Sequence, residues 1–244
     1  MKIALCMPVH GSLTKRFAFS AMNIIVACLT EGVEQKGKKE IPEIRPFMAS
    51  SSDIAFNRNI LVRDALDWGA DYLLFADVDH YIPPNGLHRL LSLDRDVVGI
   101  NYLRRDEENR QPTSARHAAG GGLELVWTTQ EKAEAGAVEQ VDFMGLGFCL
   151  VAARVFDKLT EQAKDAGRDT MWPLFHFESI EGSLFSLSED SVFFRKCAAA
   201  GISFFIDHWL SFESAHLAEL PLMFPASGQF ITSRLTSPPK RKAT

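Results

Sequence analysis

The sequence predicts an α/β protein with a mostly parallel central sheet, on three observations. Short apolar runs, too short to be helices, alternate with longer segments of helical periodicity. Helix-start residues and glycines separate the two kinds of segment. The order strand–helix then repeats over the first 103 residues, which is typical of parallel strands joined by helices. The 244 residues, 46% of them hydrophobic, suffice for one large domain of this class.

In the first part of the chain, strands are expected at residues 2–8, 43–49, 72–76 and 96–103. A helix is expected at residues 14–31, and the stretch 32–40 is charged and is expected to be a surface loop. Three serines and Asp53 offer helix caps, so a second helix should follow and run to Trp68, with Gly69 closing it. Pro83 and Pro84 are expected to begin a third helix.

The second part is expected to begin with a long polar loop, residues 104–122, of the kind that forms a lid or binding loop. Residues 123–128 and 137–143 are expected to form a small antiparallel hairpin, and 149–153 another apolar strand. Helices are expected at residues 155–166 and 188–200, with an irregular aromatic stretch at 170–187 between them. Strands are expected at 202–206 and 209–214. We expect one domain, residues 1–225, and a flexible tail, 226–244.

Composition excludes several classes of protein. A net charge of -5 with 23% charged residues gives no basic surface typical of duplex nucleic acid binding. The four cysteines are scattered in apolar surroundings without a CxxC pair, which argues against zinc or a disulfide framework and for a cytoplasmic protein. The first residues lack the features of a signal peptide, and no apolar run is long enough to span a membrane.

The strongest candidate site is Asp77-Val78-Asp79, directly after the apolar run 72–76. Side chains two apart along a strand point the same way, so both carboxylates should reach one spot at the strand's end. Two anions side by side repel unless a cation lies between them, and Mg²⁺ or Mn²⁺ prefers such oxygen ligands. The alternative is a pair of turn or helix-capping aspartates, because this short pattern also arises by chance.

Four further positions carry titratable side chains of interest. His216 follows a strand-like segment and could complete a carboxylate metal site, whereas His80 is expected to be a surface or turn histidine. Glu189 and Asp190 stand in the first turn of a helix. They are either a general base aimed into a crevice or acids that complement the helix macrodipole.

Arginines and glycines near the expected sheet edge are candidates for ligand contacts. Arg58, on the second helix, offers a planar fork that suits a diphosphate, or it pairs with a surface acid. Arg104 and Arg105 open the long loop and are phosphate clamps if it closes, or otherwise solvated charges. Gly145 and Gly147 either allow close approach of a ligand or form a tight turn.

An ordered series of segments resembles GT-A-fold glycosyltransferases of the family-2-like kind, including small phage and bacterial members. The segments are KIALCMPVHG, FNRNILVRDAL, DYLLFADVDHYIPPNGL, VVGINYLRR, VDFMGLGFCLVAARVFDKL and SEDSVFFRKCAAAGISFFIDHWLSFESAHL. The resemblance covers roughly residues 1–217 and implies a single Rossmann-like domain. The loop after Arg105 and the stretch 170–187 depart from the family pattern, so the acceptor stays open.

The resemblance also implies roles for individual residues. One acid of the D-x-D pair reaches the ribose and the other the metal, so Asp77, Val78 and Asp79 are expected at the nucleotide sugar. Both acids and His216 are the implied metal ligands, and Asp190 with Glu189 is the implied catalytic base. The implied donor site also includes the following residues, from the first strand, the second helix and the glycine turn: Pro8, His10, Arg58, Gly145 and Gly147.

The implied activity is a Mn²⁺- or Mg²⁺-dependent, inverting transfer of a sugar from a UDP- or GDP-sugar to an acceptor hydroxyl. A glycan, a lipid-linked sugar, a protein and a modified base are all open as acceptor. A nucleotidyltransferase that makes sugar nucleotides is the nearest alternative, although the loop PVHGSLTKRF has only one glycine for holding a triphosphate. A catalytically silent module that binds a nucleotide sugar is the other alternative.

Overall fold

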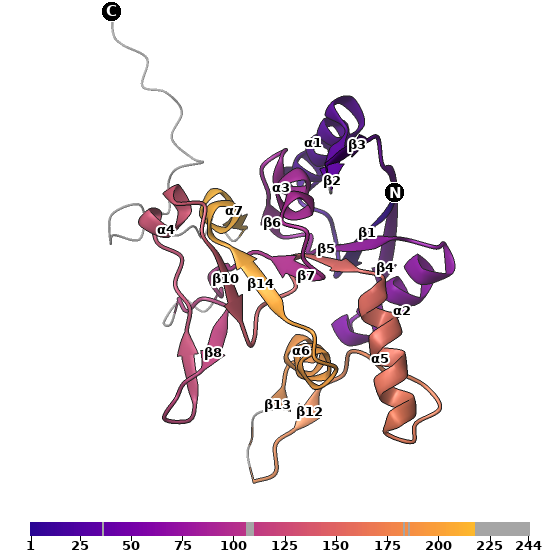
Figure 1. Ribbon diagram of the computed structural model, residues 1–244, viewed down its shortest axis with the longest axis vertical. Helices are drawn as coiled ribbons and strands as arrows, with labels where there is room; N and C mark the ends of the chain where they lie inside the picture. Colours follow the sequence, from indigo (N-terminus) through magenta and orange to yellow (C-terminus); the bar gives the residue numbers. More distant parts are fainter. Residues whose placement is uncertain (36, 106–109, 183, 185, 218–244) are drawn as a thin grey trace, which may run out of the picture.

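A seven-stranded mixed sheet forms the centre of the protein, in the order β10-β14-β7-β11-β5-β1-β4 (Figure 1). The computed structural model describes residues 1–35, 37–105, 110–182, 184 and 186–217. The sheet strands are β1 (Lys2–Val9), β4 (Glu43–Ser50), β5 (Tyr72–Ala76), β7 (Val97–Gly99), β10 (Val138–Val141), β11 (Phe148–Ala152) and β14 (Phe204–Asp207). Five of them run in one direction, while β10 and β11 run against their neighbours. The expected α/β class with a mostly parallel sheet is confirmed.

Helices cover both faces of the sheet and bury two separate apolar cores (Figure 1). On one face lie α2 (Ile54–Asp67), α5 (Arg154–Asp165) and α6 (Glu189–Ala199), and on the other α1 (Lys15–Glu31), α3 (Gly86–Ser92) and α7 (His208–Glu213). Strand β1 serves both, since Ala4 and Cys6 point into one core and Ile3 and Leu5 into the other. All four cysteines are free and buried.

Helix starts follow the expected capping chemistry. The Asp53 carboxylate accepts hydrogen bonds from the backbone N–H groups of Ala55 and Phe56, and it fixes the start of α2. Thr14 caps α1 in the same way, by accepting from the Phe17 N–H. The positions of α1 and α2 relative to the sheet are therefore set by short polar segments at the carboxyl ends of β1 and β4.

Three expectations about elements were wrong or too long, and a fourth is not tested. The stretch 32–40 is not a plain loop, because β2 (Val33–Gln35) pairs there with β3 (Lys38–Glu40). Only Val97–Gly99 of the strand expected at 96–103 is in the sheet. The strand expected at 209–214 is helix α7, since Asp207 caps it through the Leu210 N–H. The expected tail, 226–244, lies outside the described residues.

The hairpin expected between residues 123–128 and 137–143 does not form. Thr129 caps a short helix, α4 (Gln130–Glu134), between the two segments, and the chain leaves the line of a hairpin. Strand β9 (Leu123–Leu125) pairs instead with β8 (Ala115–His117), inside the expected long loop. Strand β10 pairs with β14 and becomes an edge of the main sheet. The small antiparallel hairpin is therefore β8–β9, and residues 137–143 are not part of it.

The last short strands connect distant parts of the chain. Strand β15 (Ala215–His216) pairs with β6 (His80–Tyr81) and aligns His216 with His80. Strands β12 (Glu178–Ser179) and β13 (Ser186–Leu187) form a two-stranded ribbon in the aromatic stretch. The β6–β15 pairing matters most for the site, because it brings the end of the described chain to the carboxyl end of β5.

Candidate functional site

The candidate site lies where three strands meet one edge of the sheet. Strands β5 and β7 run in the same direction and deliver the residues that follow them, Asp77 to Asp79 and Tyr102, to this edge. Strand β11 runs the opposite way, so the turn before it, with Gly145 and Gly147, reaches the same edge. The Asp77 N–H donates to the Gly147 carbonyl at 2.9 Å and ties the two segments together. In open α/β sheets, this edge is where ligands bind.

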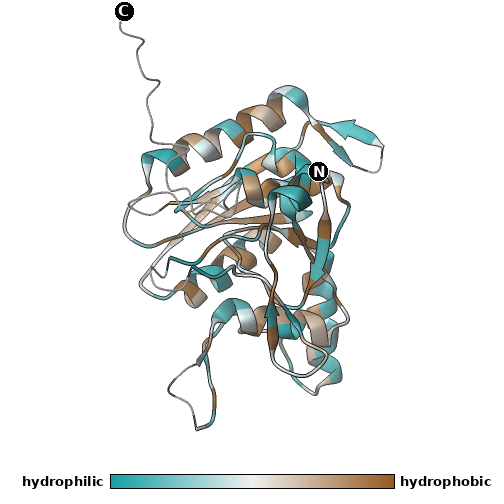
Figure 2. Ribbon diagram, turned by 90° about the vertical axis from the view of Figure 1, so that its left-hand side faces the viewer, coloured by the Kyte–Doolittle hydropathy of each residue, from teal (hydrophilic) through white to brown (hydrophobic). Residues whose placement is uncertain are grey.

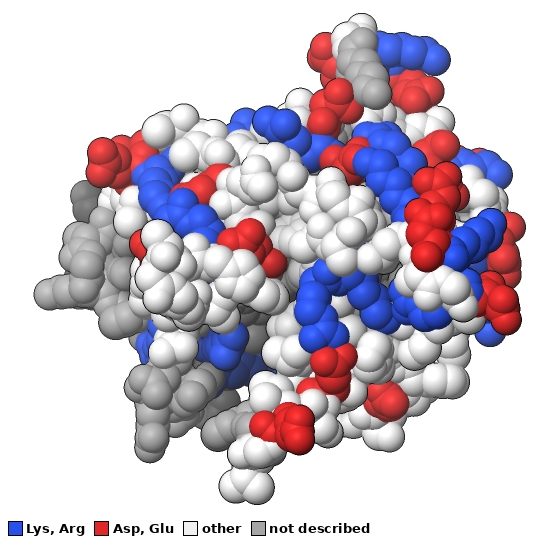
Figure 3. Space-filling model, turned by 60° about the horizontal axis from the view of Figure 1, so that its bottom comes forward, with Lys and Arg blue, Asp and Glu red and all other residues white. Residues whose placement is uncertain are grey.

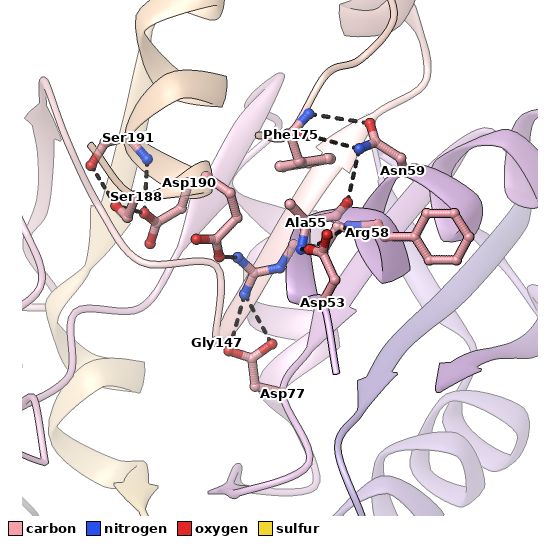
Figure 4. A network of polar contacts seen from close by, with 12 residues as sticks. Asp53, Ala55, Arg58, Asn59, Asp77, Gly147, Phe175, Ser188, Asp190 and Ser191 are labelled. Atoms are coloured by element: carbon pink, nitrogen blue, oxygen red, sulfur yellow. Dashed lines mark hydrogen bonds and ion pairs between the residues drawn. The ribbon is translucent and has the colours of Figure 1, made fainter. Parts of the chain in front are cut away.

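The two aspartates belong to separate networks, because the chain turns out of the strand before it reaches them. Asp77 faces α2, where both its carboxylate oxygens accept from Arg58 Nη2, at 3.1 and 3.2 Å (Figure 4). Asp79 faces the β6–β15 pair and the segment after β7. The alternation that would direct both side chains to one spot applies only within a strand.

Arg58 joins Asp77 to Glu189 across the bottom of the site (Figure 4). Its Nη1 donates to Glu189 Oε1, and only 4% of the Arg58 side chain is exposed. Burial opposes its charge, but Asp77 and Glu189 raise the pKa of Arg58 above its usual value. Burial also raises the pKa of Glu189, against the opposing charge of Arg58. Arg58 is therefore a buried counter-ion for two acids, with its guanidinium turned away from solvent.

Asp190 stands beside this network but is held by its own turn. Its Oδ1 accepts hydrogen bonds from the Ser188 hydroxyl and from the Ser191 N–H, the latter at 2.8 Å. The sequence allowed two roles for Glu189 and Asp190, and the two side chains differ in their surroundings. Glu189 is buried against Arg58, whereas Asp190 is partly exposed. Both hydrogen bonds to the Asp190 side chain are accepted by Oδ1, and Oδ2 takes part in neither.

Asp79 is the centre of a second network made of histidines and one arginine. Its Oδ1 lies 2.8 Å from His80 Nδ1, and its Oδ2 lies 3.5 Å from His216 Nε2 and accepts from Arg105 Nη2. Burial opposes ionisation, but the interactions with His216 and His80 hold the pKa of Asp79 well below its usual value. His80 follows a turn, as expected, but the expectation of surface exposure was wrong because its ring is buried.

Hydrogen bonds fix which nitrogen of His216 carries a lone pair. Its Nδ1 lies 2.8 Å from the Leu103 carbonyl, which can only accept, so neutral His216 keeps its proton on Nδ1. Its Nε2 then accepts from Arg105 Nε at 3.0 Å. A histidine that donates one N–H to a backbone carbonyl and offers the other nitrogen is the usual arrangement of a metal ligand.

The donor atoms around Asp79 suit a small cation. One ligand atom each from Asp79, His80 and His216 lies within 4.8 Å of the others, the group that could hold a metal within the described residues. The Arg105 guanidinium is about half exposed and bridges Asp79 Oδ2 and His216 Nε2, as a bound metal cation would. Carboxylate oxygen suits Mn²⁺, and imidazole nitrogen is a common ligand of divalent first-row metals. Asp77, the third ligand implied by the family resemblance, is outside this group and pairs with Arg58.

Tyr102, which sequence reasoning overlooked, lies between the two networks. Its ring packs edge-on against His80, with ring centroids 4.4 Å apart. Burial, Asp77, Asp190 and then Asp79 raise the pKa of its phenol well above the usual value, so three carboxylates act on one hydroxyl. The signal that could have identified it is its place three residues after the end of β7, a strand parallel to β5.

The two glycines of the turn make room for these rings. A Cβ at Gly147 would lie 2.6 Å from the His80 ring and 2.8 Å from Tyr102, and one at Gly145 would lie 2.2 Å from the Tyr102 hydroxyl. The Gly147 N–H also donates to that hydroxyl at 3.3 Å. Both glycines are therefore required by the packing of protein side chains, a reason that the sequence alone did not provide.

The remaining expected donor-site residues lie nearby with different exposures. Pro8 is buried within β1, His10 is exposed just past its end, and Val78 is partly buried. The Thr14 hydroxyl, which caps α1, lies 3.5 Å from the Val78 carbonyl. The contacts found among the described residues do not join His10 to either network. Pro8 and His10 thus stand at the carboxyl end of β1, the strand next to β5.

Comparisons with known proteins establish likeness of fold only. No family model matches the chain, and no curated protein matches it. The crystal structure of A197 from STIV is similar, with a TM-score of 0.52 and 15% identity, over 95% of this chain and 97% of that one. Its fold is shared.

Two further structures are similar at a lower level. GalNAc-T7, solved with UDP, GalNAc and Mn²⁺, has a TM-score of 0.48 and 12% identity, over 85% of this chain and 42% of that one. The 4-diphosphocytidyl-2C-methyl-D-erythritol synthase from Anaerococcus prevotii has a TM-score of 0.42 and 10% identity, over 95% and 93%. Neither similarity assigns a function to this chain.

Surface properties agree with the composition. On the face shown in Figure 3, basic and acidic side chains are interspersed and do not gather into one patch of a single sign. Among the described residues, no helix combines the length and apolar character needed to cross a bilayer.

Proposed function

We propose that this protein is a metal-dependent glycosyltransferase that moves a sugar from a nucleoside-diphosphate sugar to an acceptor hydroxyl. The observation that carries the proposal is the position of Asp79 and His216. Their lone pairs converge on one cation-binding spot at the ligand edge of an α/β sheet, beside a second acidic network. The GT-A resemblance of the ordered sequence segments supports the same conclusion.

The metal ligands in this proposal are Asp79 Oδ2 and His216 Nε2, and Arg105 leaves when the cation enters. His80 holds the other oxygen of Asp79 through its Nδ1, at 2.8 Å, and so orients the carboxylate. A divalent cation bound there would neutralise the charge of a departing diphosphate. Asp77, fixed by Arg58, is left to face the nucleoside or sugar hydroxyls of the donor.

Asp190 is the proposed base. Its carboxylate takes the proton of the acceptor hydroxyl while that oxygen forms a bond to the anomeric carbon and the bond to the diphosphate breaks. The Ser188 hydroxyl and the Ser191 N–H hold one carboxylate oxygen in place and leave the other for the proton. Glu189 takes a supporting role, because its own carboxylate is already bound to Arg58.

A panel of UDP- and GDP-sugars, assayed for Mn²⁺-dependent release of the nucleoside diphosphate, tests the proposal. Release that disappears in Asp79→Asn and His216→Asn supports it. Transfer should also disappear in Asp190→Asn while donor binding, measured by calorimetry, survives. Release of pyrophosphate from a nucleoside triphosphate and a sugar phosphate would assign nucleotidyl transfer instead. Binding of the donor without turnover of any kind would make the protein a binding module.

A further inference from the structure

Residues 100–103 follow β7 and carry two parts of the candidate site, although they lie outside the seven-stranded sheet. The Tyr102 ring packs against His80, and the Leu103 carbonyl lies 2.8 Å from His216 Nδ1 and fixes the proton there. A carbonyl can hold a ring at one angle only if its own backbone is held. Whatever fixes residues 100–103 therefore also fixes His216.

Asn101 ties this segment to the rest of the molecule through four hydrogen bonds. Its Nδ2 donates to the Val126 carbonyl at 2.7 Å and to Thr128 Oγ1 at 3.5 Å. Its Oδ1 accepts from the Ser114 N–H at 3.2 Å, and its own N–H donates to Ser211 Oγ at 2.8 Å. The partners come from the segments before α4 and before β8 and from α7, so one residue is held from three sides.

The surroundings make a polar side chain at this position unusual. Hydrophobic residues, brown in Figure 2, predominate along the strands in the middle of the molecule. Asn101 is completely buried, and its chain neighbour Ile100 and Leu103 nearby are buried apolar residues. An apolar side chain in its place would allow several packing arrangements. A buried amide is favourable only with its partners in place, so it specifies one arrangement of the backbone.

The bond to Ser211 links the two groups that must meet at the site. Ser211 lies on α7, and β15, which carries His216, follows α7 in the chain. Residues 111–113 hold the other side of the segment, where the Thr113 N–H donates to the Tyr102 carbonyl at 2.9 Å. They belong to the polar loop and not to α7. Among these contacts, the hydrogen bond of Asn101 to Ser211 thus relates the segment to the chain that carries His216.

We propose that Asn101 is a positioning residue of the candidate cation site, which directs the Leu103 carbonyl and thereby sets the tautomer and ring angle of His216. The role rests on the proposed function, in which His216 Nε2 is a ligand of the cation. A group that accepts from the second nitrogen of a ligand histidine orients the ring. Here that group is a backbone carbonyl, and Asn101 supplies the support that it needs.

Nitrogen-15 NMR of histidine-labelled, metal-free protein at pH 8 tests the proposal. The His216 resonances, assigned with His216→Asn, should show a proton on Nδ1 alone in the wild type. In Asn101→Leu, which keeps the shape but loses the amide, the two neutral tautomers should be mixed because the carbonyl is no longer held. Asn57→Leu is the matched control. Asn57 is also buried and hydrogen-bonded, but on α2, and its replacement should leave the His216 tautomer unchanged.

Calorimetric titration with Mn²⁺ gives a second readout. Asn101→Leu should bind the ion a few-fold more weakly than the wild type, less than the roughly 10- to 100-fold expected for loss of a group that contacts a ligand directly. Asn57→Leu should bind it as the wild type does. Urea unfolding checks that each variant is folded. If Asn101→Leu does not fold, Ser211→Ala replaces it in both measurements, because it removes the acceptor of the Asn101 N–H.

A His216 ring that keeps a single tautomer in the folded variant overturns the proposal. So does a wild type in which the two tautomers are already mixed, or an unchanged affinity for Mn²⁺ where the wild type binds the ion. A wild type that binds no Mn²⁺ contradicts the cation site of the proposed function instead. The tautomer of His216 in Asn101→Leu then still decides whether Asn101 positions that ring.

Discussion

His80 and His216 stack face to face, with ring centroids 4.5 Å apart and ring planes 9° apart, although they are 136 residues apart in the chain. The β6–β15 pairing sets this stack, and both rings reach the carboxylate of Asp79. Their proposed roles differ, since His216 offers Nε2 to the cation whereas His80 uses Nδ1 to hold Asp79. The two histidines therefore give a sharp test of the site.

Replacing Asp79 or His216 with Ala should abolish Mn²⁺ binding, because each removes a ligand atom. His80→Asn should only weaken binding, roughly 10- to 100-fold, because it removes a residue that orients a ligand. Isothermal titration with Mn²⁺ alone measures all three. Equal loss in His80→Asn and His216→Ala would contradict the division of roles and make His80 a ligand.

Arg105→Ala should increase the affinity for Mn²⁺, because the guanidinium occupies the place between Asp79 and His216 that the cation needs. The increase should be a few-fold, since a half-exposed ion pair contributes about 1 kcal/mol or less. Arg104→Ala is the control, because Arg104 is the adjacent residue, is exposed and carries the same charge. Titration of both variants with Mn²⁺ decides, and weaker binding in Arg105→Ala would mean that Arg105 assists the site.

Arg58→Met should lower the free energy of unfolding by about 3–5 kcal/mol, because Asp77 and Glu189 would keep buried charges without a partner. The loss should be smaller at pH 5 than at pH 8. Without Arg58 the already raised pKa of Glu189 rises further, so the folded state takes up a proton and stability falls as pH rises. Urea unfolding at both pH values measures this.

The control for Arg58→Met is Arg63→Met, five residues further along α2. The Arg63 side chain is 58% exposed, and its removal should change the free energy of unfolding by no more than about 0.5 kcal/mol. Comparable effects of the two substitutions would show that the buried network contributes little to stability.

The sequence predicted the sheet better than it predicted contacts across it. Apolar runs and caps located β1, β5 and α2, because burial and capping leave local patterns. Pairing partners leave no such pattern, and β10 was assigned to the wrong neighbour for that reason. Residues 209–214 were expected to be a strand although a local helix signal was present. Asp207 is a good helix cap, and a helix follows it.

The site was predicted in its residues but not in its connections. Asp79 and His216 were expected together and lie together, 3.5 Å apart. The pairing of Arg58 with Asp77 and Glu189 depends on how α2 and α6 pack, which no spacing in the sequence records. Gly147 is required because the His80 ring packs against it, a contact between residues far apart in the sequence.

Gly147→Ala should displace His80 and Tyr102, because the new methyl group would lie under 3 Å from both rings. We expect a loss of about 1–3 kcal/mol in the free energy of unfolding, as in other overpacked cores, together with weaker Mn²⁺ binding. Gly120→Ala is the matched control, since nothing lies within 4 Å of a Cβ there. Thermal unfolding and Mn²⁺ titration of both variants test this. Normal metal binding in Gly147→Ala would show that the His80 ring can move freely.

Stability should also fall on mild acidification, through His208. This buried ring lies 2.9 Å from Thr128 Oγ1 and 2.9 Å from Glu139 Oε2, and burial lowers its pKa below 6.5 despite Glu139. The unfolded chain then binds a proton at a higher pH than the folded one, so stability is lost as pH falls below 6.5. The pKa of Glu139 is lowered from 4.5, so its own contribution is lost only at lower pH.

The His208→Asn variant isolates this effect. It should be less stable than the wild type at pH 7.5, because it loses buried hydrogen bonds, yet its melting temperature should fall less between pH 7 and 5. His117→Gln, at an exposed position, should keep the wild-type slope. Melting temperatures at half-unit steps of pH give the comparison. An unchanged slope in His208→Asn would place the acid sensitivity elsewhere.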